Sequence, residues 1–322
     1  MGVVFSLEEG AIMITVSRLG KSFGQFWAVK DLSFNVSSGE VLGFLGPNGA
    51  GKSTTMKMIS GFLTPTEGSV RVFDMHVQRN TLAAQKVMGY LPEGAPLYTE
   101  MTVSEFLGFI ADVRGLEGKV RRDRLAAVLD QLSLKEVLAQ TIDTLSKGFK
   151  RRVGIAQAML HDPKVLILDE PTDGLDPNQK HQVRELIRNL SKDKIVIVST
   201  HILEEVSAVC SRAMIIARGS LVVDDTPDGL EARSRYYGAV TVSLSSPQNS
   251  AESVFKQIAG VEQVEGAEHD TSRFTLIPKK GEKIFKEVQA CLTAKGWQSS
   301  QLFIEKGRLD EVFRSLTQGG VA

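Results

Sequence analysis

The sequence predicts an α/β fold in which short buried strands, mostly parallel, alternate with helices. Residues 165–168 and 195–198 are short, continuous apolar runs, as expected for strands covered on both faces. Residues 181–190 lie between the two runs and have helical spacing, which predicts a crossover helix. A third apolar run, Val41–Leu45, leads into a glycine-rich segment that is followed by a helical stretch at 54–60.

The remaining elements of the first two thirds of the chain follow from the period of the apolar residues. Residues 14–36 alternate polar and apolar side chains around a break at 24–25, which predicts two strands and a turn. A further strand is expected at 68–73, and helices are expected at 103–114 and 122–132. The runs 214–217 and 221–223, separated by Arg218 and Gly219, predict a hairpin.

The composition changes after Asp228, which indicates a second domain. Residues 231–237 are charged and then aromatic and are expected to form a linker. Strands and helices then follow in the order β-α-β-β-α-β of a small ferredoxin-like unit. The strands are expected at 240–244, 261–264, 274–277 and 301–304, and the helices at 253–259, 284–294 and, last, 309–316. We therefore divide the chain into a tail at 1–12, a first domain at 13–230 and an accessory domain at 231–322, with Met13 as an alternative start.

Composition limits the classes of function. Lys plus Arg equals Asp plus Glu, 38 residues each, so the formal charge is zero and no general attraction to nucleic acid is indicated. A basic cluster at Lys147, Lys150, Arg151 and Arg152 is expected to be a solvated helix start. The two cysteines lack metal-ligand spacing and suit a reducing cytosol. No apolar stretch approaches the roughly 18 residues of a membrane span, so any spans must come from another chain.

The glycine-rich segment fits the phosphate-binding pattern G-x-x-x-x-G-K-S/T. It comprises Gly46, Pro47, Asn48, Gly49, Ala50, Gly51, Lys52 and Ser53, with Thr54 next to it. Glycines let successive backbone N–H groups approach phosphate oxygens, and the following helix adds the positive end of its dipole. Lys52 is predicted to reach the β- and γ-phosphates, and the Ser53 hydroxyl to bind Mg²⁺. The strand–loop–helix context therefore predicts a nucleoside triphosphate site.

Two carboxylates follow the apolar run 165–168. The carboxyl end of a buried parallel strand is where open α/β sheets place their ligand sites. Asp169 is predicted to hold Mg²⁺, and Glu170 to polarise an attacking water as a general base. A strand that simply ends in a solvated acidic turn is the alternative, and the phosphate loop upstream disfavours it.

Three further segments occur in a characteristic order around the acidic strand. They are LSKGF at 145–149, GLDP at 174–177 and STH at 199–201. With the phosphate loop and the acidic strand, they resemble the signature, the D-loop and the switch histidine of the nucleotide-binding domain of ABC ATPases. The resemblance covers residues 14–228. It implies a P-loop NTPase fold of ABC type, with an antiparallel β subdomain and a helical subdomain beside the parallel core sheet, and it implies ATP and Mg²⁺ as cofactors.

The resemblance also implies roles for residues outside the phosphate loop. Two copies pair head to tail in this family, so Ser146 and Gly148 of one copy would bind the γ-phosphate held by the other, with Asp176 in the D-loop between them. His201 would contact that phosphate and orient the water with Glu170. Phe23 matches the aromatic residue that stacks on adenine. Trp27 is a rival for this role, and either ring could instead belong to the core.

Two positions depart from the family pattern. Lys147 and Phe149 replace the usual Gly and Gln of the signature, although the donors at Ser146 and Gly148 are kept. Glu93 stands where the family usually has a Gln that touches the metal and links to the membrane partner. A carboxylate can bind Mg²⁺ as well, and it adds negative charge beside Asp169 and Glu170.

GYLPE at 89–93, LSKGF and the C-terminal LDEVF at 309–313 are similar to the ATPases of ABC-2-type exporters, especially the gliding-motility-associated kind. The resemblance implies a homodimer at the cytoplasmic face of the cell membrane, bound to a separate permease. Phe106, Leu107, Phe109 and Ile110 are candidates for the permease groove or for the core. The resemblance implies that the C-terminal domain is a regulatory or dimer-bracing unit, and the alternative is a packing appendage with no site. The alternatives are a soluble ABC ATPase without a membrane partner and a module that holds nucleotide without turnover.

Overall fold

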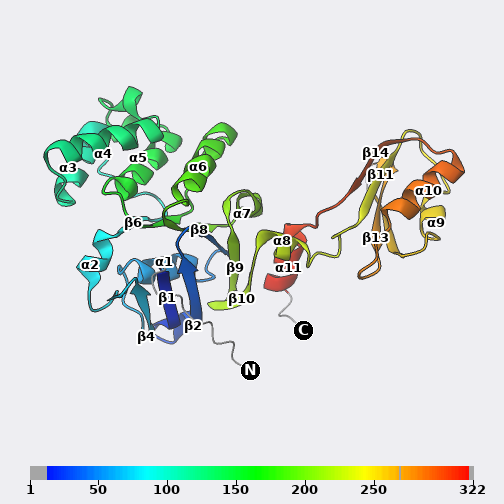
Figure 1. Cartoon of the computed structure of the whole chain (residues 1–322), viewed down its shortest axis with the longest axis horizontal. Coiled ribbons are helices and arrows are strands. Elements are labelled where there is room, and N and C mark those ends of the chain that lie inside the picture. Colours follow the sequence, from blue (N-terminus) through cyan, green and yellow to red (C-terminus); the bar gives the residue numbers. More distant parts are fainter. Residues whose placement is uncertain (1–12, 268–269, 319–322) are drawn as a thin grey trace. The chain divides into compact units, whose positions relative to one another are not determined.

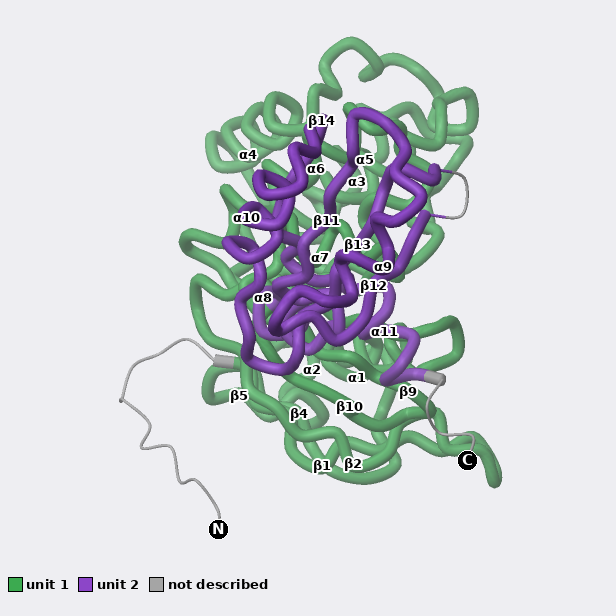
Figure 2. The backbone as a smooth tube through the Cα atoms, turned by 90° about the vertical axis from the view of Figure 1, so that its right-hand side faces the viewer, with its two compact units in different colours: residues 1–226 green, residues 227–322 purple. Residues whose placement is uncertain are grey.

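The chain folds into two compact units. A computed structural model of the protein describes residues 13–267 and 270–318, so the tail expected at 1–12 lies outside the described residues. Contacts between residues divide the chain into units of residues 1–226 and 227–322 (Figure 2). This division lies a few residues before the boundary that composition suggests.

A six-stranded sheet with the order β10-β9-β3-β8-β7-β6 forms the centre of the first unit (Figure 1). Its strands are β3 (Val41–Leu45), β6 (Met88–Leu91), β7 (Val165–Asp169), β8 (Ile195–Thr200), β9 (Arg212–Ala217) and β10 (Ser220–Asp225). The first five are parallel, and β10 pairs antiparallel with β9 at the edge. The predicted parallel sheet and the predicted hairpin are both confirmed.

The central sheet is covered on both faces, and this explains its continuous apolar runs. Every residue of β3, β7 and β8 is buried. Along β7, Val165 and Ile167 pack into a core with the antiparallel strands and the first helix, whereas Leu166 and Leu168 pack into a second core with the larger helices. Alternate side chains of a strand point to opposite faces, so each face requires its own apolar set.

The remaining elements of the first unit surround this sheet. A second sheet has the order β2-β1-β4-β5, with neighbouring strands antiparallel. Its strands are β1 (Met13–Phe23), β2 (Phe26–Ser37), β4 (Glu67–Val72) and β5 (Met75–His76). The helices are α1 (Lys52–Ile59), α2 (Thr81–Lys86), α3 (Val103–Val113), α4 (Gly118–Gln131), α5 (Lys147–Met159), α6 (Pro177–Leu190) and α7 (Leu203–Val209), with short 3-10 turns at Lys135–Val137 and Ile142–Thr144.

Capping residues explain where several helices begin. Thr102 and Glu105 form a reciprocal capping box at the start of α3, which lies close to its predicted bounds. Asp176 accepts a hydrogen bond from the Gln179 N–H, and Pro177 occupies the first turn of α6. The helix therefore starts before residue 181, where apolar spacing alone placed it. Similarly, α4 begins at Gly118 rather than at 122.

The second unit has the predicted β-α-β-β-α-β order. Its sheet order is β12-β13-β11-β14, and all neighbouring strands are antiparallel. The elements are α8 (Pro227–Glu231), β11 (Val240–Leu244), α9 (Ala251–Phe255), β12 (Val261–Ala267), β13 (Asp270–Pro278), α10 (Phe285–Lys295), β14 (Ser299–Ile304) and α11 (Leu309–Gln318). Residues of α9 and α10 share one core with the inner side chains of the sheet, and both helices lie on the same face of it (Figure 1).

The segment 231–237, expected to be a linker, packs within the second unit instead. Tyr236 is buried, its hydroxyl donates to Glu265 at 2.8 Å, and the Arg308 guanidinium lies 3.6 Å from the ring centroid. Ser234 donates to Glu311 of α11 at 2.7 Å. The charged and aromatic side chains that suggested a linker therefore form hydrogen bonds and ring contacts with residues far along the chain.

We predict that Phe255→Ala destabilises the second unit by about 3–5 kcal/mol, because the ring is fully buried and its removal leaves a cavity. Phe255 makes edge-to-face contacts with Phe274 and Trp297, at centroid distances of 5.4 and 5.8 Å. Urea unfolding followed by Trp297 fluorescence in a Trp27→Phe background measures the loss. Phe303→Ala, at a half-exposed position, is the control and should change stability little. Equal effects of the two variants would contradict this view of the core.

Candidate functional site

The glycine-rich loop between β3 and α1 is tightly packed against neighbouring backbone. A Cβ on Gly46 would lie 2.4 Å from the Ile216 carbonyl oxygen, and one on Gly51 would lie 2.5 Å from that of Ala28. Gly49 and Gly51 have positive φ angles of 79° and 104°, a region that glycine adopts without strain. The backbone path of this loop therefore favours glycine at positions 46, 49 and 51.

Lys52 begins α1 and points back over the loop. Its Nζ donates to the Gly46 carbonyl at 2.7 Å, and the side chain is almost fully buried. Ser53 and Thr54, the next two residues, are partly exposed at the start of the helix. Buried residues of α1, including Met56, Met58 and Ile59, anchor the helix in the core beneath the central sheet. The loop, the lysine and the N-terminus of α1 thus place positive charge and backbone N–H groups at one point.

Asp169 ends β7 and is 1% exposed. The Ser199 hydroxyl of the adjacent strand β8 donates to its Oδ1. Among the described residues its other oxygen, Oδ2, is buried and has no hydrogen-bond partner. A buried carboxylate oxygen without a partner is costly, so this atom is suited to a cation or to a donor brought by a ligand.

Glu170 follows directly and is held in an unusual backbone conformation. Its φ is +51°, and its N–H donates to the Ser199 carbonyl and hydroxyl, both at 3.1 Å. Its Oε2 lies 2.9 Å from Nδ1 of His201, which follows β8. Burial raises the pKa of the Glu170 carboxyl, and the hydrogen bond from His201 and the charge of Lys52 oppose that shift. The two residues expected to act on the water are therefore in contact.

Arg151 of α5 lies beneath these carboxylates, and the expectation of a solvated basic cluster is wrong for it. Its side chain is 6% exposed, and its guanidinium donates to the carbonyls of Asp169 and Glu170 and, at 3.5 Å, to that of Pro92. Burial lowers the pKa of Arg151, while nearby acids, Asp173 first among them, oppose the shift.

Arg152 is buried as well and donates to the Leu132 carbonyl at 3.1 Å. Lys147, in contrast, is exposed as expected.

Glu93 lies in the loop after β6, and its side chain is exposed. Strand β6 is the parallel neighbour of β7, so the loops carrying Glu93 and Glu170 lie at the same edge of the sheet. Arg151 donates to the carbonyls of both loops and so ties them together. The sequence placed Glu93 near the acids, but it gave no sign of the buried guanidinium between them.

Ser146, Gly148 and Asp176 lie together at the starts of α5 and α6. The Ser146 hydroxyl caps α5 by accepting from the Phe149 N–H at 3.3 Å, as Asp176 caps α6. A Cβ on Gly148 would lie 2.1 Å from the Gln179 side chain. Among the described residues, no hydrogen bond joins this group to the phosphate loop of the same chain.

Phe23 and Trp27 differ in their availability for stacking. Phe23, at the end of β1, is 52% exposed, and the Lys21 ammonium lies 5.3 Å from its ring centroid. Trp27 is partly buried, and its ring closes over Gly20, where a Cβ would lie 3.1 Å away. Phe26, which the sequence did not single out, is the cross-strand partner of Phe23 and is also exposed.

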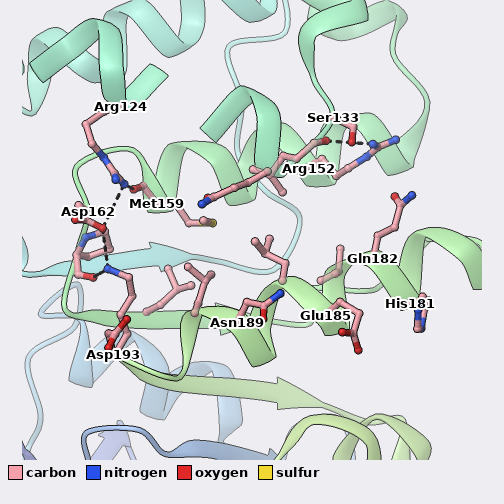
Figure 3. A pocket seen from close by; sticks show the side chains of 18 residues that line it. Arg124, Ser133, Arg152, Met159, Asp162, His181, Gln182, Glu185, Asn189 and Asp193 are labelled. Carbon is pink, nitrogen blue, oxygen red and sulfur yellow. Dashed lines mark hydrogen bonds and ion pairs between the residues drawn. The ribbon is translucent and has the colours of Figure 1, made fainter. Parts of the chain in front are cut away.

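A cavity of about 730 Å³ lies apart from these residues, between α4, α5 and α6 (Figure 3). Its charged walls are largely paired internally. Asp162 interacts with Lys194 at 2.8 Å and with Arg124 at 3.3 Å. None of the residues predicted for nucleotide or metal lines it. Within the described residues there is also no group of three or more His, Cys, Asp or Glu arranged to hold a metal.

The fold and the loop after β3 together define a P-loop nucleotide-binding protein of the α/β class. A family model described as "ABC transporter" matches residues 29–173. The linearmycin resistance ATP-binding protein LnrL of Bacillus subtilis (strain 168) is 31% identical over 306 residues, which cover 95% of this chain and 98% of that protein. The chain belongs to the ATP-binding proteins of the ABC transporter family, as the resemblance implied.

Two further comparisons agree with this. The probable multidrug ABC transporter ATP-binding protein YbhF of Escherichia coli (strain K12) is 37% identical over 238 residues, which cover 73% of this chain and 41% of that protein. The chain thus spans less than half the length of this relative. A solved structure of an ATP-binding subunit of an ABC transporter matches with a TM-score of 0.64 at 31% identity, covering 69% of this chain and 92% of that chain.

We predict that Arg151→Ala lowers the free energy of unfolding of the first unit by about 3 kcal/mol, because it leaves buried carbonyl groups without their charged donor. The structure offers Arg122→Ala as a matched control, since Arg122 is exposed on α4. Chemical denaturation of both variants measures the difference. If the two variants were equally stable, the buried hydrogen bonds of Arg151 would not be a structural requirement.

Proposed function

We propose that the chain is an ATP-hydrolysing subunit that pairs with a second copy around two ATP molecules and drives a separate membrane-spanning exporter. The observation that carries the proposal is the contact between Glu170 and His201, 2.9 Å apart, next to a buried lysine-bearing phosphate loop. A protein that only stored nucleotide would not need a base and an orienting histidine in contact.

The phosphate loop is the proposed binding site for the ATP phosphates. Its N–H groups and the N-terminus of α1 would bind the phosphate oxygens, and Lys52 would exchange its bond to the Gly46 carbonyl for the β- and γ-phosphates. Phe23 is proposed to stack on adenine, because its ring is more exposed than that of Trp27.

The residues present also fit Mg²⁺. Asp169 offers a buried carboxylate oxygen without a partner, Ser53 a hydroxyl at the start of α1, and Glu93 an exposed carboxylate on the neighbouring loop. Mg²⁺ usually takes few protein ligands and completes its shell with phosphate oxygens and waters, so a few oxygen ligands of this kind suffice. When bound, it would neutralise charge on the phosphates.

Glu170 is proposed to accept a proton from the attacking water, and His201 to fix the direction of that carboxylate. Burial raises the pKa of Glu170, which makes it a stronger base than a solvated glutamate. The Ser199 and Arg151 contacts hold the backbone on either side of the carboxylate. The chain therefore supplies a pre-positioned base, and little rearrangement is needed once the water is in place.

The second half of each ATP site is proposed to come from the other copy. Ser146, Lys147 and Asp176 are exposed, and within the described residues none of them forms a hydrogen bond to the phosphate loop of the same chain. A helix N-terminus with a serine hydroxyl is well suited to an anion. Head-to-tail pairing would bring this surface onto the γ-phosphate of the partner copy.

A permease surface is proposed on the ends of α1, α2 and α3. Exposed apolar side chains lie at or near these ends: Phe62, Leu82, Phe109 and Val113, with Tyr98 of the loop before α3 packed on Phe109 at a centroid distance of 5.6 Å. Hydrogen bonds join the three segments, from Gln85 Nε2 to the Ser60 carbonyl at 3.2 Å and from Arg114 to the Gln85 carbonyl at 2.9 Å. Such a group is larger than the isolated apolar residues usual on a surface. Of the four residues considered earlier, Phe106 and Leu107 are core, Ile110 is partly buried against that core, and Phe109 is exposed.

This surface would place the chain at the cytoplasmic face of the cell membrane. None of the helices that the structure describes is both long and apolar enough to cross a bilayer. The C-terminal unit has its own core, and we propose that it is an accessory domain that regulates or braces the dimer. The relatives' names, which refer to multidrug transport and linearmycin resistance, agree with export.

We predict that Glu170→Gln lowers ATP turnover by about 100-fold or more, because it removes the base but keeps the nucleotide contacts. ATP binding should persist, and the variant should accumulate as an ATP-bound dimer on size-exclusion chromatography. The control is Glu204→Gln, an exposed glutamate on α7. Normal hydrolysis by the Glu170 variant would show that this residue is not the base.

We predict that the double variant Phe62→Glu/Leu82→Glu loses its membrane partner while its basal ATPase activity is unchanged. The measurement is a pull-down of the tagged protein from detergent-solubilised membranes, followed by mass spectrometry. Val120→Glu, at an exposed apolar position on α4, is the control. Recovery of the same multi-span protein with the double variant would refute the surface, and recovery of no membrane protein with the wild type would favour an ABC ATPase without a permease.

A further inference from the structure

Glu205 is a buried carboxylate that bonds to both loops that carry the Glu170–His201 pair. It lies in the first turn of α7 and is 4% exposed. The Thr172 hydroxyl donates to its Oε1, and the Thr200 hydroxyl donates to its Oε2 at 2.9 Å. Each oxygen of one carboxylate thus holds a different segment of chain.

The two threonines lie close in sequence to Glu170 and His201. Thr172 is two positions after Glu170, in a turn closed by bonds from the Asp173 N–H to the Glu170 carbonyl and from the Leu175 N–H to the Thr172 carbonyl, both at 3.2 Å. Thr200 immediately precedes His201, and its hydroxyl also accepts from the Ile202 N–H at 3.0 Å. A shift of Glu205 would therefore move both loops relative to each other.

Packing alone does not account for a carboxylate at this position. Burying an ionised carboxylate is costly, and among the described residues no Lys, Arg or His forms an ion pair with Glu205. An apolar side chain would fill the same space at lower cost. Its neighbour Glu204 is exposed and already places a negative charge in the first turn of α7, so the helix dipole does not explain a second, buried acid.

We propose that Glu205 is a positioning residue that fixes the distance between Glu170 and His201. The inference rests on the proposed function, since it assumes that this pair acts on the attacking water. The carboxylate accepts a hydroxyl from each loop and so joins the ends of β7 and β8 beyond their last ladder bonds. Among the described residues, its side-chain hydrogen bonds go to Thr172 and Thr200, and neither threonine is proposed to bind nucleotide.

The test is a double-mutant cycle in the full-length protein. Glu205→Ala is expected to lower kcat by about 100-fold, the cost of misplacing a catalytic group by roughly 1 Å, with ATP affinity unchanged in titrations with a fluorescent ATP analogue. His201→Ala should cause a similar loss. The double variant should be no slower than His201→Ala alone, because both changes remove the same geometry.

Two variants separate positioning from simple destabilisation. Glu205→Gln keeps an acceptor for one threonine and offers an amide to the other, so it should recover most of the lost kcat. Glu204→Ala should behave as wild type. If Glu205→Ala fails to fold, Thr172→Val and Thr172→Ser replace it, and only the valine variant, which lacks the hydroxyl, should lose kcat.

The outcomes separate this inference from the proposed function. Wild-type kcat in Glu205→Ala, or losses that multiply in the double variant, would overturn the positioning role. Equal kcat values for Thr172→Val and Thr172→Ser would also overturn it. Full activity of Glu170→Gln and His201→Ala would instead overturn the proposed chemistry of the pair.

Discussion

The structure depends on the burial of both faces of the inner strands β3, β7 and β8 of the central sheet. Because both faces are buried, the strands contain little besides apolar residues, and polar chemistry is confined to the points where strands end. The phosphate loop, Glu93, Glu170 and His201 all follow the carboxyl ends of parallel strands, and Asp169 is the last residue of β7. The order β3-β8-β7-β6 then brings segments far apart in the sequence to one edge of the sheet.

Three acidic side chains lie at one edge of the sheet, and the buried positive charge of Arg151 offsets their mutual repulsion. Asp169, Glu170 and Glu93 would repel one another in a poorly solvated site. Arg151 enters from α5 and binds the carbonyls of the loops that carry them, so it supplies positive charge without occupying the carboxylate oxygens. Lys52, at the end of the phosphate loop, adds a second positive charge that opposes the rise in the pKa of Glu170. The helix that begins at Ser146 is thereby mechanically connected to the acidic loops.

The sequence predicted those features whose causes are local. Continuous apolar runs indicated β3, β7 and β8, and the glycine pattern indicated a loop in which neighbouring backbone blocks a side chain at Gly46 and Gly51. The order of elements in the C-terminal unit also followed from periodicity. The start of α6 was missed because apolar spacing begins late, whereas the cap at Asp176 and Pro177 sets the first turn.

What the sequence did not predict depends on partners distant along the chain. From the sequence, Arg151 and Arg152 were expected to be solvated, because the backbone carbonyls that accept their hydrogen bonds belong to distant segments of the chain. Tyr236 looks like part of a linker, because Glu265 and Arg308 lie far downstream. Proximity of Glu170 and His201 required knowing that β7 and β8 are neighbours, and the role of Glu205 required knowing where two threonines meet.

The left-handed backbone at Glu170 has a consequence for how this protein can be changed. A side chain at φ +51° costs roughly 1–2 kcal/mol relative to an ordinary conformation, and glycine avoids that cost. A library selected for heat resistance alone would therefore accumulate glycine at position 170, and each such clone would lack the carboxylate. At this residue, resistance to unfolding and turnover are in direct competition, so selection for either one must be checked against the other.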